Sequence, residues 1–164
     1  MLLKRILVIL SFLLLFGCSM GRDQYSGHYK VGKSYKVKSI TYKPHEVEHY
    51  DRIGVASWYG PGFHGKKTAN GEVFNKRELT AAHPTLPLPS VVRVINLQNK
   101  KSVVVRVTDR GPFMKKGDKP RIIDLSERAA EILGMKDSGL AKVRVKLLPK
   151  TTEELHKRLQ LRKT

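Results

Sequence analysis

This chain of 164 residues contains several acidic side chains that lie among aromatic residues and glycines, and these are its candidates for chemical function. Glu72 follows an Asn-Gly pair, Asp109 opens the run Asp-Arg-Gly-Pro, and Asp124 stands in Ile-Asp-Leu-Ser. Trp58 and Tyr59 are adjacent and precede a glycine. Aromatic rings stack on the apolar faces of sugar rings, and carboxyl groups donate and accept protons. The combination indicates a carbohydrate site with carboxyl chemistry.

Each acidic residue also has a structural interpretation that the sequence leaves open. Asp109 suits a turn in which its side chain accepts backbone N–H bonds before the Gly-Pro pair. Glu72, beside Asn-Gly, suits a solvated turn. Asp124 suits a cap near Ser126 or an ion pair with Arg121. Only the arrangement of these residues in space separates the two interpretations.

Two familiar motifs are interpreted as chance matches. The segment 45–49 fits H-E-x-x-H, which binds zinc only when a helix places both imidazoles on one face. It lies in a polar stretch without the apolar residues that would bury such a helix. The segment 60–67 is one residue short of a phosphate-binding P-loop, and no amphipathic helix follows it. The sequence indicates neither a metal site nor a cofactor requirement.

Segments rich in β-branched residues predict the elements that must position these side chains, and several of them alternate apolar and polar residues strictly. Asn99 and Lys100 predict a hairpin turn. Ser126 predicts an N-cap for a short helix, Glu127–Leu133, that ends at Gly134. The predicted strands are Ile53–Tyr59, Val91–Leu97, Ser102–Asp109, Arg121–Asp124 and Leu140–Leu148.

Closely spaced strands with little helix do not form a layered α/β sheet, and closing a sheet removes its exposed edges. We therefore expect a mainly β fold, a small barrel over residues 51–149 with one or two short helices. Residues 18–50 are polar and rich in Tyr, Lys and His, which predicts a linker that contains a small hairpin. Residues 150–164 predict a frayed basic helix.

Residues 1–17 have the order of an export signal. Lys4 and Arg5 precede an apolar run that is too short to span a bilayer. The four residues that end in Cys18 resemble a lipobox, in which the cysteine sulfur receives a diacylglyceryl group before cleavage. Ser19 resembles the sorting address of outer-membrane lipoproteins. We expect a protein anchored to a membrane through lipid on Cys18, facing the periplasm and held at the outer membrane.

The chain is strongly basic, with a formal net charge of +18 that falls to +16 when the two basic residues of the signal are removed. The positive electrostatic potential of such a protein favours polyanionic partners. Export makes anionic lipid headgroups or the carboxylate-bearing cell wall the expected partners, and not nucleic acid. The charge alone does not decide between these two partners.

Several motifs together resemble the rare lipoprotein A family, and the resemblance spans residues 54–148 and the lipobox. It implies a six-stranded double-psi β-barrel and lytic transglycosylase activity. Such an enzyme cleaves peptidoglycan glycan strands endolytically, favours strands without stem peptides, and forms 1,6-anhydro-muramic ends. The motifs are Ala56–Gly60, Lys67–Phe74, Thr80–His83, Leu86–Pro89, Val107–Phe113 and Ile122–Ser126.

By motif position, the resemblance implies that Asp109 and Glu72 are the catalytic carboxyls and that His83 accompanies them in the cleft. Asp109 is expected to protonate the leaving oxygen and then to accept a proton from the C6 hydroxyl of the muramic acid residue. Glu72 is expected to orient that hydroxyl or to stabilise positive charge on the sugar. Asp124 matches a position that holds a key acid in expansin-type barrels.

Further substrate contacts are expected from Arg110, which would position a substrate oxygen or an N-acetyl carbonyl, and from Trp58 and Tyr59, which would stack on sugar rings. Alternatives remain open here as well. His83 suits hydrogen bonds to loop backbone, and Trp58 suits the barrel core.

Two other functions remain open on the sequence. The first is that of a non-catalytic lipoprotein that binds peptidoglycan or loosens the wall, because some barrels of this type bind glycan without cleaving it. The second is that of a scaffold whose basic surface binds division or envelope proteins. The chemical nature of the ends left on digested glycan separates these functions from lytic cleavage.

Overall fold

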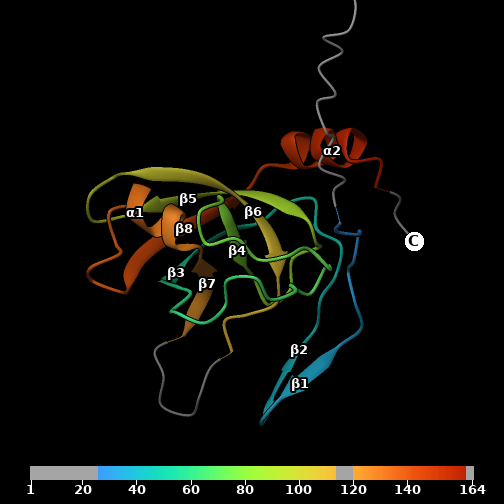
Figure 1. Cartoon of the computed structure of the whole chain (residues 1–164), viewed down its shortest axis with the longest axis horizontal. Helices are drawn as coiled ribbons and strands as arrows, with labels where there is room; N and C mark the ends of the chain where they lie inside the picture. Colours follow the sequence, from blue (N-terminus) through green and yellow to red (C-terminus); the bar gives the residue numbers. More distant parts are fainter. Residues whose placement is uncertain (1–25, 114–119, 162–164) are drawn as a thin grey trace, which may run out of the picture.

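The computed structural model describes residues 26–113 and 120–161, so the export signal and Cys18 lie outside the described residues. The main body is a closed barrel of six strands in the order β3-β7-β4-β6-β5-β8 (Figure 1). Two of the strand pairs, β3 with β7 and β4 with β6, are parallel, and the others are antiparallel. The six strands are β3 (Asp51–Trp58), β4 (Thr80–Ala82), β5 (Ser90–Asn96), β6 (Ser102–Asp109), β7 (Arg121–Leu125) and β8 (Ala141–Leu147).

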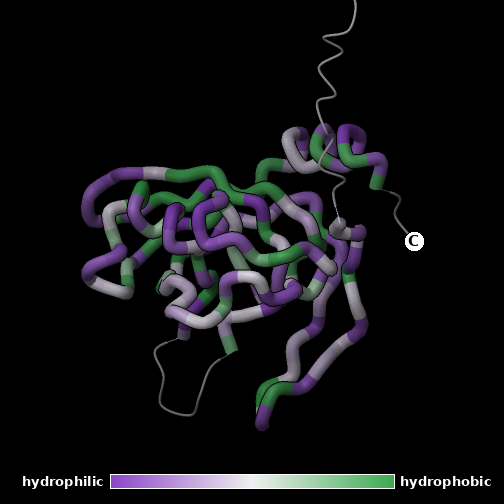
Figure 2. Tube along the Cα trace, in the orientation of Figure 1, coloured by the Kyte–Doolittle hydropathy of each residue, from purple (hydrophilic) through white to green (hydrophobic). Residues whose placement is uncertain are grey.

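The barrel interior is filled by apolar side chains that alternate with outward-facing residues along the strands. In β8, Val143 and Val145 are fully buried, whereas Lys142 and Arg144, which alternate with them, are exposed. Figure 2 shows the hydrophobic residues concentrated in the barrel strands. The largest buried side chains of the core are Leu86, Leu88, Ile123, Leu125, Leu133, Met135, Val92, Val94, Val105 and Val107.

The three-residue strand β4 was missing from the sequence prediction. Thr80, Ala81 and Ala82 are all buried, so the strand has no alternation of apolar and polar residues to reveal it. Its position between β6 and β7 is fixed by pairing with residues about 25 to 45 positions away in the chain. Without β4 the barrel would not close.

The helix α1 (Glu127–Ile132) begins as the sequence predicts and ends one residue earlier. The hydroxyl of Ser126 accepts a hydrogen bond from the backbone N–H of Ala129 across 3.2 Å, as expected of an N-cap. Gly134 has a φ of 66°, the left-handed conformation that commonly ends a helix. The fully buried Ala129 and Ala130 allow this short helix to pack closely on the barrel.

The described part of the predicted linker, residues 26–50, packs against the barrel. It contains a hairpin of β1 (Tyr35–Val37) and β2 (Ile40–Tyr42), which projects from the barrel in Figure 1. Lys30 exchanges two backbone hydrogen bonds with Leu88, of 2.8 and 2.9 Å. Tyr29 is buried at 7% exposure. The predicted hairpin is therefore present, whereas residues 28–31, which were expected to lie in a linker, are docked on the barrel; we call residues 28–31 the N-terminal strap.

The C-terminal residues also form a docked element instead of a frayed one. Helix α2 (Pro149–Arg158) lies over β5, with Leu155 buried at 7% exposure. The hydroxyl of Thr152 accepts a hydrogen bond from the backbone N–H of Val91, and His156 is hydrogen-bonded to the carbonyl of Pro89. Across residues 26–113 and 120–161, the model contains no helix of the length and apolar character that crossing a membrane requires.

Candidate functional site

The strand register brings Asp109 and Asp124 to the same end of the barrel. Ala82 in β4 is paired with Asp109 of β6 on one side and with Asp124 of β7 on the other. Ser57 of β3 continues this row as the partner of Asp124. Because neighbouring strands lie about 4.8 Å apart, the backbones of the two acidic residues are about 10 Å apart. Residues from four strands therefore contribute to one site.

The Asp109 carboxylate is half-buried and is held by three donors. Its Oδ1 accepts hydrogen bonds from the backbone N–H groups of Ala69 and Arg110, both of 2.8 Å. Its Oδ2 accepts a hydrogen bond of 3.0 Å from the hydroxyl of Tyr59. Burial and the nearby Asp109 carboxylate raise the pKa of Tyr59, so this phenol stays a neutral donor. Asp109 thus accepts backbone N–H bonds, as the turn-capping interpretation predicts, while its second oxygen is held by a side chain.

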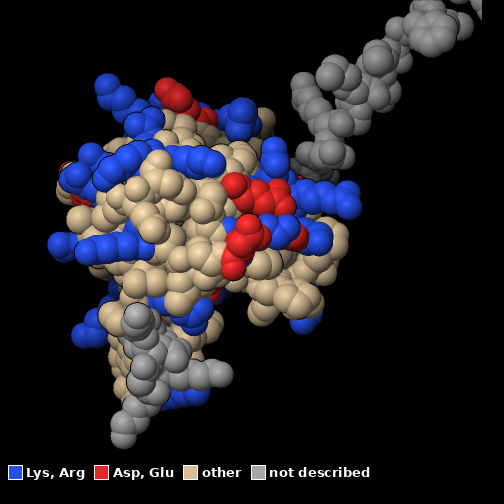
Figure 3. Space-filling view, turned by 90° about the vertical axis from the view of Figure 1, so that its left-hand side faces the viewer, with Lys and Arg blue, Asp and Glu red and all other residues tan. Residues whose placement is uncertain are grey.

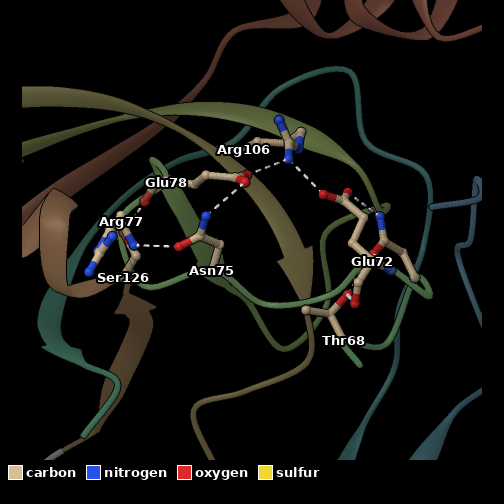
Figure 4. Close-up of polar contacts among 8 residues, drawn as sticks. Thr68, Glu72, Asn75, Arg77, Glu78, Arg106 and Ser126 are labelled. Carbon is tan, nitrogen blue, oxygen red and sulfur yellow. Dashed lines mark hydrogen bonds and ion pairs between the residues drawn. The ribbon is translucent and has the colours of Figure 1, made fainter. Parts of the chain in front are cut away.

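The second predicted carboxylate, Glu72, is enclosed and not solvated. Its side chain is 9% exposed. Its Oε1 accepts a hydrogen bond of 2.8 Å from the side-chain amide of Asn70, and its Oε2 lies 2.6 Å from Nη2 of Arg106 (Figure 4). The interpretation of Glu72 as a solvated turn residue is therefore wrong.

A tight turn of residues 68–72 joins the two carboxylates. Ala69 donates to Asp109 and the adjacent Asn70 donates to Glu72. The turn is closed by a 2.8 Å hydrogen bond from the backbone N–H of Thr68 to the carbonyl of Glu72. Gly71 takes a φ of 92°, a conformation that favours glycine. The sequence Thr-Ala-Asn-Gly-Glu thus serves both acidic groups at once.

Asp124 has a different environment from Asp109. Its Oδ1 accepts hydrogen bonds from the hydroxyl of Ser57 and, at 3.4 Å, from Nη1 of Arg121. Burial raises the pKa of Asp124, and its bonds to Ser57 and Arg121 oppose this effect only in part. The expected ion pair with Arg121 is present, whereas the cap of α1 is supplied by Ser126.

An aromatic pocket of about 350 Å³ lies beside Tyr59. The ring of Tyr59 contacts Phe74 and Phe63, with centroids 4.6 and 5.2 Å away. Trp58 packs partly against the core, and its Nε1 donates to the carbonyl of Lys136 across 3.1 Å. The two predicted aromatic residues therefore face one pocket, next to Asp109. Its lining residues are Trp58, Tyr59, Gly60, Pro61, Gly62, His64, Phe74, Lys76 and Glu127.

His83 does not reach this cleft, and its predicted contact with substrate is wrong for this structure. The residue is 1% exposed. Its Nδ1 accepts hydrogen bonds from the backbone N–H groups of Thr85 and Leu86, and its Nε2 is 2.9 Å from the hydroxyl of Tyr50. Burial lowers the pKa of His83 to about 3. The open alternative, a histidine that orders loop backbone, is the one observed.

Arg110 also has a structural role where a substrate contact was predicted. Its Nη1 donates to the carbonyls of Leu86, at 2.6 Å, and His83, at 3.3 Å. Its Nη2 donates to the carbonyl of Val31 across 2.6 Å. A guanidinium offers several donors in a fixed fork, which suits it to join three chain segments. Arg110 therefore fastens the N-terminal strap and the loop after β4 to the turn that follows Asp109.

The N-terminal strap also touches the turn between the carboxylates. The backbone N–H of His28 donates to the carbonyl of Asn70 across 2.8 Å, and Nζ of Lys30 donates to the carbonyl of Ala69 across 3.1 Å. Both acceptors lie in the turn that holds Glu72 and Asp109. The site thus depends on residues outside the barrel that the sequence prediction assigned to a linker.

Arg106 is the main site residue that the sequence analysis missed. It is a half-buried cation in β6, where the neighbouring residues are valine and threonine. A charged residue inside an apolar strand was the signal that could have identified it, because such a charge needs a partner. Its partners, Glu72 and Glu78, lie about 30 residues away in the chain.

The two segments that match zinc and P-loop motifs have irregular conformations. Residues 45–49 are not helical, and residues 60–67 form turns that no helix follows. Within the described ranges, no three side chains of His, Cys, Asp or Glu gather where a metal ion would need them.

The surface of the protein is mainly basic. Figure 3 shows Lys and Arg side chains spread over the face that it presents, with Asp and Glu in few places.

The chain is similar to known proteins over most of its length. Residues 51–145 match the family model described as lytic transglycolase. A Rickettsia felis protein named endolytic peptidoglycan transglycosylase RlpA is 56% identical over 142 residues, which cover 85% of this chain and 60% of that protein. A Campylobacter jejuni protein of the same name is 49% identical over 124 residues, which cover 75% of this chain and 44% of that protein.

This chain thus spans about 60% or less of the length of those relatives. Among solved structures, the Streptomyces papain inhibitor aligns with a TM-score of 0.47 and 23% identity, over 60% of this chain and 94% of that chain. The family match covers more than half of the chain and includes Glu72, Asp109 and Asp124. The chain therefore belongs to the lytic transglycolase family, and its closed six-stranded barrel is a double-psi β-barrel.

Proposed function

We propose that this protein is a lytic transglycosylase that cleaves the glycan strands of peptidoglycan. The observation that carries the proposal is the turn of residues 68–72, which hydrogen-bonds Asp109 from Ala69 and Glu72 from Asn70. Two carboxylates held by one turn, beside an aromatic pocket, suit cleavage of a glycosidic bond. The names of the relatives agree with this activity.

Asp109 is the group that transfers the proton. As an acid it protonates the O4 leaving group while the bond to the anomeric carbon breaks. As a carboxylate it then accepts the proton of the C6 hydroxyl, whose oxygen attacks the anomeric carbon and closes the 1,6-anhydro ring. The hydrogen bond from Tyr59 orients Oδ2 for both steps. No water molecule enters the reaction.

Glu72 has the complementary role of a fixed negative charge. Its contacts with Asn70 and Arg106 hold the carboxylate in one orientation. The transition state of glycoside cleavage carries positive charge on the sugar ring, which a fixed carboxylate stabilises. Glu72 therefore acts through its charge, and Asp109 through its proton.

The aromatic pocket beside Tyr59 supports the binding of a sugar ring next to the scissile bond. Trp58 and Tyr59 supply flat apolar surface, and Lys76 lines the same pocket. Muramic acid without a stem peptide carries a free lactyl carboxylate. Where a stem peptide is attached, the same carboxyl is an amide without charge, and a basic protein attracts it less strongly. We therefore propose endolytic cleavage with a preference for stem-free strands.

Digestion of stem-free sacculi, followed by mass spectrometry of the released glycan ends, tests the function. The expected product is 1,6-anhydro ends from the wild type and none above background from Asp109→Asn. Hydrolytic reducing ends would refute the lytic mechanism. Binding to sacculi without any product would favour the alternative, a non-catalytic wall-binding or wall-loosening lipoprotein. Full activity in Asp109→Asn would mean that another residue transfers the proton. Asp124, whose pKa is raised, would then be the next candidate.

We further propose that the protein is anchored to the outer membrane through lipid on Cys18 and faces the periplasm, near division or envelope proteins. The support is the order of Lys4, Arg5, the apolar run and the single cysteine, followed by Ser19. Metabolic labelling with a palmitate analogue should label the wild type and not Cys18→Ser, and the label should fractionate with the outer membrane. An unlabelled wild type would contradict the anchor.

A further inference from the structure

Arg106 in β6 lies between two carboxylates from separate turns (Figure 4). Its Nη2 is 2.6 Å from Oε2 of Glu72 and 3.3 Å from Oε2 of Glu78. The side chain of Glu72 is 9% exposed, whereas that of Glu78 is 50% exposed. One guanidinium thus forms an enclosed ion pair with a site residue and a solvated ion pair with a surface residue.

The two ion pairs differ in what they contribute. Solvated pairs are weak, because water screens them. In an enclosed pair, removal of one partner leaves the other charge without compensation in a medium of low dielectric constant. The position of Glu72 therefore depends on Arg106 far more than the position of Arg106 depends on Glu78.

The surrounding chain holds Arg106 in place. Its backbone N–H donates to the carbonyl of Leu79 across 2.9 Å, next to Glu78. The backbone carbonyl of Glu78 accepts a 2.6 Å hydrogen bond from the hydroxyl of Ser126, and its side chain accepts one of 3.3 Å from Asn75 (Figure 4). The guanidinium therefore contacts Glu72 from a strand and a turn that are held by hydrogen bonds.

We propose that Arg106 is a positioning residue of the transglycosylase, which acts by fixing the Glu72 carboxylate in the orientation that the transition state requires. This inference rests on the proposed function. Arg106 touches no reacting atom in this mechanism. Its loss therefore lowers the rate of the chemical step through Glu72 and leaves the affinity for glycan nearly unchanged.

A double-mutant cycle on the full chain tests the proposal, with kcat and KM measured from the release of 1,6-anhydro ends from stem-free glycan. Arg106→Gln should lower kcat at least tenfold and change KM less than threefold. Glu72→Gln/Arg106→Gln should be no slower than Glu72→Gln alone, because the arginine then has no carboxylate to position. Arg106→Lys should recover part of the lost kcat.

Matched controls are available on neighbouring positions. Arg93→Gln removes an exposed arginine from the adjacent strand β5 and should leave kcat within twofold of the wild type. Glu78→Gln removes only the solvated pair and should lower kcat less than fivefold. If Arg106→Gln melts below the assay temperature, the same cycle is run with Arg106→Lys.

The outcomes separate the two proposals. An active wild type with an unchanged kcat in Arg106→Gln overturns the role of Arg106 and leaves the proposed function intact. A further multiplicative loss when Arg106→Gln is added to Glu72→Gln also overturns it, since Arg106 would then act independently of Glu72. A wild type that releases no anhydro ends refutes the proposed function and the positioning role together.

Discussion

The hydroxyl of Tyr59 donates a hydrogen bond to Oδ2 of Asp109 across 3.0 Å, while two backbone N–H groups hold Oδ1 of the same carboxylate. The two oxygens of Asp109 are therefore not equivalent. One is fixed to the chain, and the other faces a side chain that also lines the aromatic pocket. This geometry couples the group proposed to transfer the proton to the surface proposed to bind a sugar ring.

Tyr59→Phe should lower kcat about tenfold and change KM little. The variant keeps the ring and loses only a hydrogen bond to a charged group, which contributes about 1.5 to 3 kcal/mol. The release of anhydro ends measures both constants. Tyr50→Phe is the control, because it removes a tyrosine hydroxyl from His83 and not from a carboxylate, and its kcat should stay within threefold of the wild type. Equal rates for Tyr59→Phe and the wild type would contradict the role of the phenol.

Local signals in the sequence predicted local structure well. Ser126 predicted the start of α1 because a capping hydroxyl acts on residues three positions away. The alternation in β8 predicted a strand because burial of one face leaves a period of two. The short strand β4 has no such period, and its pairing depends on distant strands. The sequence therefore predicted a barrel but not its closing strand.

The carboxylates of the candidate site could be predicted from the sequence, whereas the residues that contact them could not. Asp109 and Glu72 could be predicted because each lies in a run of consecutive residues that resembles a motif of the family. The donors of Arg110 reach carbonyls 24 to 79 residues away, which no local pattern encodes. The guanidinium that looked available for substrate is therefore occupied by the fold itself.

Asp124→Asn should raise the free energy of unfolding at pH 7 relative to the wild type. Burial raises the pKa of Asp124. Its contribution to stability is therefore complete below its unfolded pKa of about 3.9 and is lost as the pH rises through the folded pKa. The difference in the free energy of unfolding between the variant and the wild type should shrink as the pH falls toward 3.5. Urea unfolding at pH 7 and pH 3.5 measures this difference. A larger difference at low pH would contradict the upward direction of the pKa shift of Asp124.

His83→Asn should weaken the dependence of stability on pH between 5.5 and 7.5. Burial lowers the pKa of His83 to about 3, so the unfolded chain binds a proton that the folded chain does not. The stability contributed by His83 is thus present above its unfolded pKa of about 6.5 and is lost as the pH falls, by at most about 1.4 kcal/mol per pH unit. Asn keeps an acceptor for the loop N–H groups.

Urea unfolding at several pH values in this range measures the slope for each variant. His45→Asn replaces an exposed histidine and should leave the slope unchanged. A slope that stays the same in His83→Asn would show that another group is responsible for it.

Gly71→Ala should impair the site more than Gly62→Ala, although both glycines have a φ near 90°. A methyl group at Gly71 would meet Nδ1 of His28 at 3.2 Å, whereas at Gly62 nothing lies within 4 Å. Backbone strain costs each variant about 1 to 2 kcal/mol. Only Gly71→Ala pushes the N-terminal strap away from the turn that holds Glu72, so its kcat should fall about tenfold further. Partial recovery in Gly71→Ala/His28→Ala would identify the strap as the cause, and equal rates in both glycine variants would contradict it.

Leu155→Ala should lower the free energy of unfolding by about 2 to 3 kcal/mol, because Leu155 is the buried apolar anchor of α2 on the barrel. Lys150→Ala, an exposed change in the same helix, should alter stability by less than about 0.5 kcal/mol. Urea unfolding followed by circular dichroism measures both. The helix contacts β5 through Thr152 and Val91, and β5 pairs with the strand that carries Arg106. A stability loss in Leu155→Ala as small as that in Lys150→Ala would mean that α2 is not an integral part of the barrel domain.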